Sequence, residues 1–156
     1  MTPAILLARK AKVPHMVHEY QHDADAESYG GEAAEKLGQA PERVFKTLVV
    51  QLDKALAVAI LPVNTMLSLK QMAKACGSKK AAMADKMLAQ RSTGYVLGGV
   101  SPLGQKKRLL TVIDDSANQF PSIFVSAGRR GLEIELSPAD LQKLTQARVA
   151  LISVDD

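Results

Sequence analysis

The sequence predicts an α+β fold: a single domain over residues 1–156, with a mixed, mostly antiparallel, curved and barrel-like sheet surrounded by helices. A chain of 156 residues has the usual size of one domain and can bury a substantial core. Runs of β-branched and apolar residues lie close together, and amphipathic helical segments are interspersed among them irregularly. A regular alternation of strands and helices would instead favour a parallel sheet.

The first half of the chain is expected to open with a helix. Thr2 suits its N-cap, Pro3 its first position, and Ala4–Lys12 its body. The next predicted elements are a strand over Val13–Tyr20, a loop over 21–28, a helix over Gly31–Leu37 closed by Gly38, a turn at Pro41–Arg43, and strands over Val44–Leu52 and Ala55–Pro62. The short link Asp53-Lys54 predicts that the last two strands form a hairpin.

The second half mixes short helices and strands. Ser68 and Asp85 are typical N-caps and predict helices over Ser68–Ala75 and Asp85–Gln90, and Ser137-Pro138 opens a final helix in the same way. Strands are predicted over Tyr95–Leu97, Leu109–Asp114, Ser122–Ser126 and Leu132–Leu136, with a tight turn at Ala127–Gly131 and an edge strand over Ala150–Val154.

Composition narrows the classes of protein. No apolar run approaches the length of a membrane span, and the N-terminal charges follow the apolar patch instead of preceding it as in a secretory signal. The lone Cys76 excludes an internal disulfide and fits a reducing compartment, so we expect a cytoplasmic protein with no membrane contact. A net charge of +4 permits contact with nucleic acid, but three Phe, three Tyr and no Trp argue against binding mainly by base stacking.

The segment Arg91–Arg108, RSTGYVLGGVSPLGQKKR, carries the strongest functional signal. Glycines such as Gly98 and Gly99 let backbone N–H groups approach a ligand closely and form an anion- or carbonyl-binding nest. The basic run Lys106-Lys107-Arg108 suits a phosphate-bearing partner. The alternative is a glycine-rich turn followed by a solvated charge run.

Lys46 is the first candidate side chain, because it interrupts the apolar strand Val44–Val50. Strand alternation puts Val44, Lys46, Leu48 and Val50 on one face. A lysine there must reach water, pair with an acid, or line a cavity, since an unpaired buried ammonium is costly. The alternative is a lysine on an edge strand that points to water.

Other reactive side chains form no convincing catalytic or metal set. The histidines lie close together in sequence, but without a Cys pair or HExxH we expect no metal. Cys76 lies at a predicted helix C-terminus, where the helix dipole raises the thiol pKa and makes a poor nucleophile. Tyr20 and Tyr29 suit either a pocket wall or a half-buried core. No P-loop and no strand–GxGxxG–helix unit occurs, so we expect no nucleotide cofactor.

A tight turn near the C-terminal strands adds charge. Arg129 and Arg130 lie on the bend Gly128–Gly131, and Glu133 and Glu135 follow it. We expect one of the two acids to face the sheet interior or a cleft and to pair with a base; the alternative is an ordinary surface ion pair.

Together these segments resemble one family. FKTLVV around Lys46, KKAAMADK, AQRSTGY, GGVSPLGQKKR and SAGRRGLEIEL occur in the order and spacing of the YbaK-type Cys-tRNA(Pro) deacylases, relatives of the editing domain of bacterial prolyl-tRNA synthetases. The resemblance covers nearly the whole chain. It implies an enzyme that hydrolyses mischarged Cys-tRNA(Pro) and acts on the tRNA acceptor end, in partnership with prolyl-tRNA synthetase.

The resemblance also implies the site. Its catalytic positions are Lys46, Gly98 and Gly99, and its substrate contacts are Tyr20, Tyr29, Ser101, Pro102 and Glu133. The tRNA acceptor stem is expected to bind electrostatically to the cations Lys106, Lys107, Arg108, Arg129 and Arg130. Two departures concern the pocket rim: Gly31 stands where relatives often carry Asp, and Glu133 is one methylene longer than the usual Asp.

The implied chemistry needs no protein nucleophile. The substrate's own thiol attacks its ester, and the protein positions the reactants and stabilises the oxyanion. Two alternatives stay open at this stage: a hydrolase for Ala-tRNA(Pro), which would need an activated water, and a non-catalytic module that binds tRNA or a nucleotide.

Overall fold

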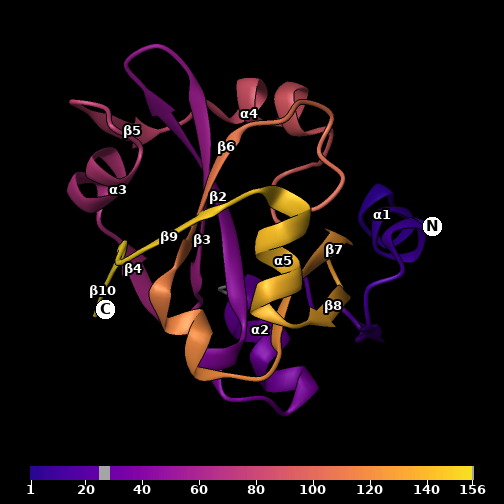
Figure 1. Ribbon diagram of the computed structural model, residues 1–156. Helices are drawn as coiled ribbons and strands as arrows, with labels where there is room; N and C mark the ends of the chain where they lie inside the picture. The colour runs from indigo at the N-terminus through magenta and orange to yellow at the C-terminus, as the bar shows by residue number, and fades with distance from the viewer. Residues whose placement is uncertain (25–28, 156) are drawn as a thin grey trace.

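The computed structural model of the protein describes residues 1–24 and 29–155 (Figure 1). Its helices are α1 (Pro3–Ala11), α2 (Tyr29–Leu37), α3 (Leu69–Ala75), α4 (Lys86–Thr93) and α5 (Pro138–Thr145), with the short 3-10 helices η1 (Pro41–Arg43) and η2 (Asp115–Gln119). Its strands are β1 (His15–Glu19), β2 (Phe45–Leu52), β3 (Leu56–Pro62), β4 (Thr65–Leu67), β5 (Ala81–Met83), β6 (Leu110–Asp114), β7 (Ile123–Arg129), β8 (Leu132–Leu136), β9 (Arg148–Ala150) and β10 (Ser153–Asp155).

The helices begin where capping chemistry predicts. The side chains of Thr2, Ser68, Asp85 and Ser137 each accept a hydrogen bond from a backbone N–H in the first turn of the helix that follows. Each cap satisfies a donor that the helix cannot use itself. The four predicted starts are therefore confirmed.

Most strand pairs are antiparallel. A five-stranded sheet has the order β5-β2-β3-β6-β9, a three-stranded sheet the order β1-β8-β7, and β4 pairs with β10. The predicted β2–β3 hairpin is confirmed, and the parallel pairs are β3–β6 and β6–β9. The α+β prediction holds, but the sheets do not close into a barrel, so the barrel-like part of the prediction is not confirmed.

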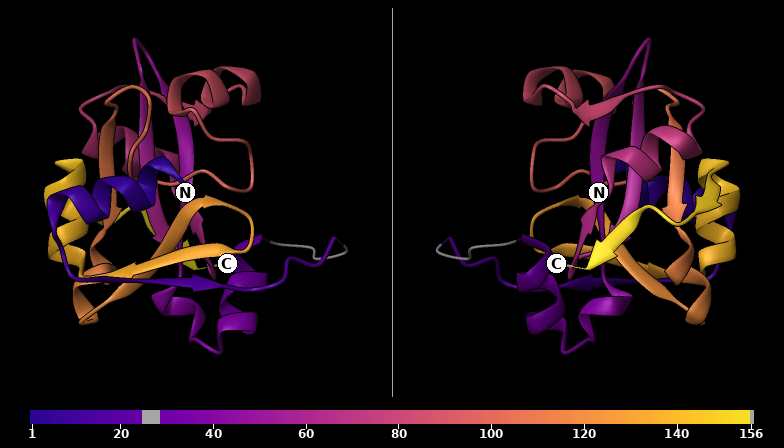
Figure 2. Two further views of the ribbon diagram at one scale, coloured as in Figure 1. Left: turned by 90° about the vertical axis from the view of Figure 1, so that its right-hand side faces the viewer. Right: turned by 90° about the vertical axis from the view of Figure 1, so that its left-hand side faces the viewer.

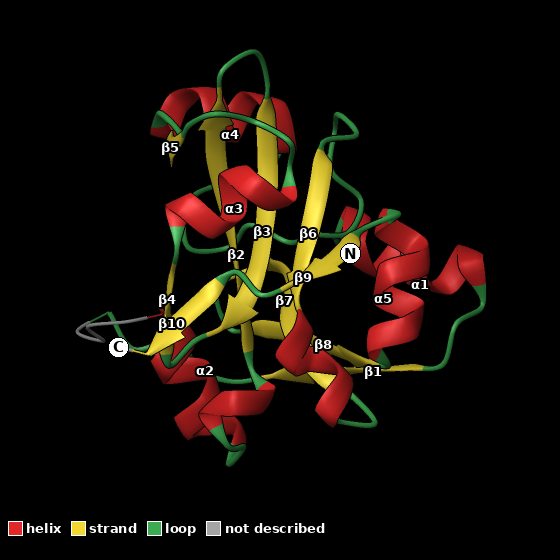
Figure 3. Cartoon of the chain, turned by 60° about the vertical axis from the view of Figure 1, so that its left-hand side comes forward, coloured by secondary structure: helices red, strands yellow, loops and turns green. Residues whose placement is uncertain are grey.

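The two larger sheets pack against each other around a shared core. Phe45 and Ile60 from the five-stranded sheet meet Val125 and Ile134 from the three-stranded sheet, and α1 and α5 cover the same core. Figure 2 shows α1 and α5 side by side. Met72 of α3 packs on the opposite face of the five-stranded sheet (Figure 3). A parallel bridge between Val44 and Phe124 joins the two sheets near the start of β2.

One predicted strand is wrong. Residues Tyr95–Leu97 form no strand, because Gly94 ends α4 in the left-handed region with φ of 82° and the chain turns away. The segment after the loop returns to the helix end, where the Lys106 and Lys107 N–H groups donate to the carbonyls of Thr93 and Ser92. Tyr95–Leu97 therefore has no strand to pair with.

Other element bounds differ in detail. Strand β7 continues through the predicted turn to Arg129, and its register shifts after Ser126. The predicted edge strand at Ala150–Val154 is two strands, because the Asp114 carboxylate accepts from the Ile152 and Ser153 N–H groups and interrupts it. The short strands β4 and β5 were not predicted. The predicted loop over 21–28 lies partly outside the described residues.

None of the helices within the described ranges combines the length and the apolar character that a membrane span requires.

Candidate functional site

A cavity of about 400 Å³ lies where the two sheets, α2 and the loop over residues 94–105, called here the glycine loop, meet. Its walls are formed by Tyr20, Tyr29, Gly30, Phe45, Lys46, Thr47, Leu48, Leu97, Gly98, Val100, Ser126, Arg130 and Glu133. Lys46, Gly98, Tyr20, Tyr29 and Glu133, all predicted from the sequence, therefore come together on one cavity from five separate parts of the chain.

Lys46 lies near the start of β2 and lines this cavity. Lining a cavity was one of the three environments that we expected for a lysine in this strand. Its ammonium donates a hydrogen bond to the carbonyl oxygen of Thr65, 2.5 Å away on β4. This bond holds the long side chain along the cavity wall and restricts its rotamers. A cation held in this way suits an anionic or polar part of a ligand.

Glu133 points into the same cavity from β8. Only 6% of the residue is exposed, and burial raises the pKa of its carboxyl to about 8. No ion pair joins it to a base in the described part of the chain. Tyr20 lies close by: burial and the charge of Glu133 raise the pKa of its hydroxyl to about 12. The cavity thus holds a carboxyl whose charge state changes close to neutral pH.

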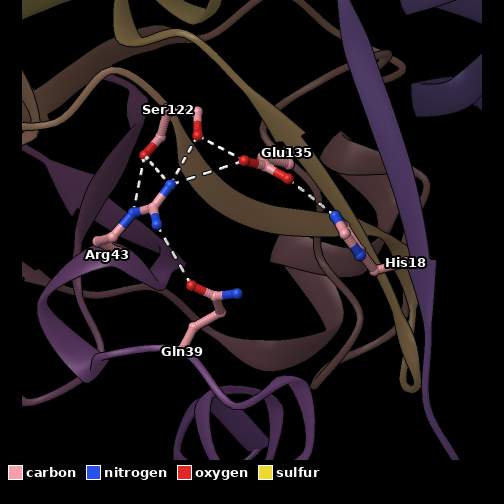
Figure 4. Close-up of polar contacts among 5 residues, drawn as sticks. All are labelled: His18, Gln39, Arg43, Ser122 and Glu135. Carbon is pink, nitrogen blue, oxygen red and sulfur yellow. Dashed lines mark hydrogen bonds and ion pairs between the residues drawn. The ribbon is translucent and has the colours of Figure 1, made fainter.

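Glu135, two residues further along β8, makes the ion pair that the sequence assigned to one of the two acids. Its carboxylate contacts His18 Nε2 at 2.9 Å, Ser122 Oγ at 2.5 Å and Arg43 Nη2 at 3.6 Å (Figure 4). Burial opposes ionisation of Glu135, but hydrogen bonds from Ser122 and His18 and the charge on Arg43 outweigh it and lower the pKa. The acid in the cavity and the paired acid are therefore different residues.

The two central glycines of the loop have different surroundings. Gly98 lines the cavity with φ of 88°, and no described residue accepts a hydrogen bond from its N–H. The Gly99 N–H, also predicted to face the oxyanion, instead donates to the Val96 carbonyl at 3.0 Å, and Gly99 packs against the backbone of Arg129. This geometry favours Gly98 alone as an N–H donor to a ligand.

Ser101 and Pro102 do not lie on the cavity wall. Ser101 is fully buried, and its hydroxyl accepts from the Leu103 N–H. Pro102 lines a second cavity of about 210 Å³, together with Lys107 and Arg108, between the loop, α1 and α5. Both residues support the loop from behind, so the structure does not bring them to the predicted substrate position.

The predicted tRNA-binding cations occupy two places. Lys106, Lys107 and Arg108 are exposed on the chain that leaves the loop. Arg129 is exposed at the end of β7, and Arg130 lines the mouth of the main cavity. The two groups of basic residues, which are far apart in the sequence, thus lie on either side of the glycine loop.

The other candidates occupy structural positions. His22 Nδ1 lies 2.7 Å from Glu32 Oε1, and the described residues contain no cluster of His, Cys, Asp and Glu suited to a metal. The pKa of the Cys76 thiol is raised in the predicted direction, but the main cause is burial and not the helix dipole, and Arg148 opposes it. Neither Cys76 nor any histidine belongs to the lining of the main cavity.

Comparison with known proteins gives this arrangement a family. A model described as the aminoacyl-tRNA editing domain matches residues 24–144, which is well over half of the chain. The chain belongs to the aminoacyl-tRNA editing domain family. The resemblance predicted from the sequence is confirmed at the level of the family, and membership supports the prediction of a deacylase enzyme.

Individual relatives agree with this family. The editing domain is 40% identical over 159 residues to an Enterococcus faecalis protein named "Putative Cys-tRNA(Pro)/Cys-tRNA(Cys) deacylase EbsC", with 99% of this chain and 94% of that protein covered. A crystal structure of "a putative trans-editing enzyme for prolyl tRNA synthetase" has a TM-score of 0.81 at 23% identity and covers 90% of this chain and 87% of its own. The crystal structure of a hypothetical protein has a TM-score of 0.87 at 23% identity and covers 97% of this chain and 99% of its own. The two structures share the fold.

Several cavity residues of the editing domain escaped sequence reasoning. Leu48 shares the face of Lys46 by strand alternation, but Phe45 and Thr47 also line the cavity, and alternation would put both of them on the opposite face. Ser126 lies directly opposite Glu133 in the β7–β8 pair. Ser126 could have been found only from the register of the β7–β8 pair, because this register places the residue opposite Glu133 at the same site.

Proposed function

We propose that this editing domain is a trans-editing deacylase that cleaves the ester of mischarged Cys-tRNA(Pro). The observation that carries the proposal is the single cavity that gathers Lys46, Gly98 and Glu133 without a cysteine or histidine among its described lining residues. The name of the E. faecalis relative supports the same substrate class. The cavity of about 400 Å³ suits a small aminoacyl group with part of its ribose.

The proposed reaction uses the thiol of the substrate as nucleophile. Its sulfur forms a bond to the ester carbonyl carbon, and the bond from that carbon to the ribose oxygen breaks. The thiol proton ends on the ribose oxygen, so the products are free tRNA and a cyclic thiolactone, which water later opens to cysteine. The step balances without an added reactant, and the protein contributes position and charge stabilisation.

Each named residue has a role in this scheme. The Gly98 N–H, which no described residue uses, donates to the carbonyl oxygen as negative charge develops there. Lys46, fixed on the wall by Thr65, contacts the ribose or phosphate of the terminal nucleotide. Glu133 binds the α-amino group, whose positive charge favours the carboxylate and offsets its burial.

A second candidate is hydrolysis of Ala-tRNA(Pro), and one observation favours it. Alanine has no thiol, so water must attack, and a base near the ester must take its proton. Glu133, with a carboxyl pKa raised to about 8 by burial, is a cavity residue that could accept that proton. The two candidates assign Glu133 different tasks and therefore predict different substrates.

The proposed partners are the acceptor end of tRNA(Pro) and prolyl-tRNA synthetase, which makes the mischarged product. The exposed cations Lys106, Lys107, Arg108 and Arg129 support contact with the phosphate backbone. Nothing in this chemistry requires a metal or cofactor.

A deacylation assay separates the candidates. Purified protein is mixed with tRNA(Pro) charged with Cys, Ala or Pro and with Cys-tRNA(Cys), and loss of the aminoacyl group is followed. Rapid loss of Cys with little loss of Ala or Pro supports the proposal. Equal or faster loss of Ala would favour the water mechanism, and stability of all four substrates would point to a binding module.

A further inference from the structure

Tyr29 and Arg130 form a stacked pair at the mouth of the cavity. Tyr29 opens α2 and Arg130 lies on the β7–β8 turn, and both line the cavity. The central guanidinium carbon of Arg130 lies 3.8 Å from the centre of the Tyr29 ring. At this distance the guanidinium lies over the face of the ring, and the attraction between cation and ring holds the two groups together.

Contacts from several segments hold this pair in place. Behind Tyr29, the His22 ring stands edge-on with its centre 6.0 Å away, and Glu32, which is 6% exposed, binds His22 at 2.7 Å. Arg130 Nη2 lies 3.5 Å from the Leu97 carbonyl oxygen. The stack is therefore supported from α2, from the chain after β1 and from the glycine loop.

Gly98 connects the stack to the proposed catalytic loop. A methyl group on Gly98 would lie 2.6 Å from Arg130 Nε and 2.7 Å from Tyr29 Cε2, so the loop backbone packs directly against the pair. A ligand that contacts the Gly98 N–H inside the cavity must therefore pass beside the Tyr29–Arg130 stack on its way in.

The surface next to the stack is apolar. Val96 and Leu97 are 63% and 49% exposed on the loop, and Leu97 also lines the cavity. A site built for phosphate would surround the guanidinium with further N–H donors and leave its edge free for bidentate contact. Here the guanidinium lies over an aromatic ring beside two exposed aliphatic side chains, which is the chemistry that accepts the flat π-face of a nucleobase.

We propose that the Tyr29–Arg130 stack is a platform for the terminal nucleobase of the tRNA substrate. The inference rests on the proposed function: the aminoacyl group enters the cavity, the ribose passes Gly98, and the base stacks on the guanidinium beside Val96 and Leu97. Stacking accepts any base, so the platform anchors the end of the chain without reading its sequence. It fixes the ester relative to the Gly98 N–H.

The test uses two analogues that the protein cannot readily cleave. One is 3′-amino-3′-deoxyadenosine 5′-monophosphate carrying cysteine through an amide bond, and the other has the same ribose, phosphate and amide but no base. Calorimetry measures both dissociation constants for the wild type, Arg130→Lys and the double variant Tyr29→Ala/Arg130→Ala. Arg91→Ala is the control, because Arg91 is exposed on α4 and does not line the cavity. Circular dichroism and thermal unfolding verify that each variant is folded.

We expect the wild type and Arg91→Ala to bind the analogue with the base at least about fivefold more tightly. The double variant should show less than about a twofold preference. Arg130→Lys keeps the charge but loses the flat face, so its preference should also fall. Equal binding of both analogues by the wild type, no binding of either, or a full preference in the double variant or in Arg130→Lys would overturn the inference.

Deacylation of Cys-tRNA(Pro) by the wild type is measured alongside, so that the two proposals can fail separately. Deacylation without a base preference would contradict only the platform. A base preference without deacylation of any charged tRNA would contradict the proposed function and leave the stack as a nucleotide-binding site.

Discussion

Glu133→Gln should remove an unfavourable dependence of stability on pH. In the folded protein burial raises the pKa of Glu133 to about 8, whereas an unburied Glu has a value of 4.5. Between these two values the folded state holds a proton that the unfolded state has released, so stability falls as pH rises through this window. Glutamine fills nearly the same volume and cannot ionise, so it removes this loss.

The magnitude follows from the shift. Each unit of pKa difference corresponds to about 1.36 kcal/mol, so the free energy of unfolding of the wild type should fall, relative to Glu133→Gln, by about 4 kcal/mol between pH 5 and pH 9. This is a large part of the free energy of unfolding of a typical domain, which is about 10 kcal/mol. Urea unfolding of both proteins at pH 5, 7 and 9 measures the difference, since other titrating groups cancel.

Glu135→Gln is the matched control, because Glu135 lies two residues away on the same strand and its pKa is lowered. Stability contributed by such a group is present above the unfolded pKa and lost only as pH falls through the folded pKa. The difference in free energy of unfolding between Glu135→Gln and the wild type should therefore stay nearly constant between pH 7 and pH 9. A difference for Glu133→Gln that also stays constant would contradict this prediction, because it would mean that the cavity carboxyl ionises without cost.

Three further predictions concern activity. Lys46→Ala should stay folded but lose tenfold or more in deacylation, since a charged contact is worth about 1.5–3 kcal/mol; near-normal rates would remove Lys46 from the site. Gly98→Ala should lower activity more than the thermal midpoint, because its methyl would meet Arg130 Nε at 2.6 Å; a loss of activity that only tracks loss of folded protein would make the loop structural. Replacing Lys106, Lys107 and Arg108 by Ala should flatten the salt dependence of tRNA binding by about 0.7–0.9 per lost phosphate contact, and an unchanged slope would place the tRNA elsewhere.

Local chemistry explains what the sequence predicted well. A cap needs only an oxygen and the N–H groups two or three residues on, so Thr2 and Ser137 mark their helices without knowledge of the fold. The two-residue link Asp53-Lys54 between apolar runs likewise determines a hairpin. Lys46 was identifiable because a cation inside an apolar strand requires a special environment, and the cavity supplies it.

Contacts between residues that are far apart in the sequence explain the features that the sequence did not predict. Tyr95–Leu97 has the composition of a strand, but the loop folds back onto α4 and leaves it no partner. Alternation puts Glu133 and Glu135 on the same face of β8, so it cannot tell which is paired; that depends on Arg43, which comes from η1. The resemblance assigned the whole loop to the site, but it could not show that Gly98 lines the cavity while Ser101 is buried behind it.

A comparison of a thiol substrate with a hydroxyl substrate tests whether the substrate itself supplies the nucleophile. Deacylation rates are measured for Cys-tRNA(Pro) and Ser-tRNA(Pro), which differ only in sulfur against oxygen, and the first product of the Cys reaction is trapped. If the substrate thiol is the nucleophile, the Ser ester is cleaved far more slowly, the trapped product is the thiolactone, and Cys76→Ser changes neither result. Comparable rates for the two esters, with free cysteine as the first product, would contradict this mechanism.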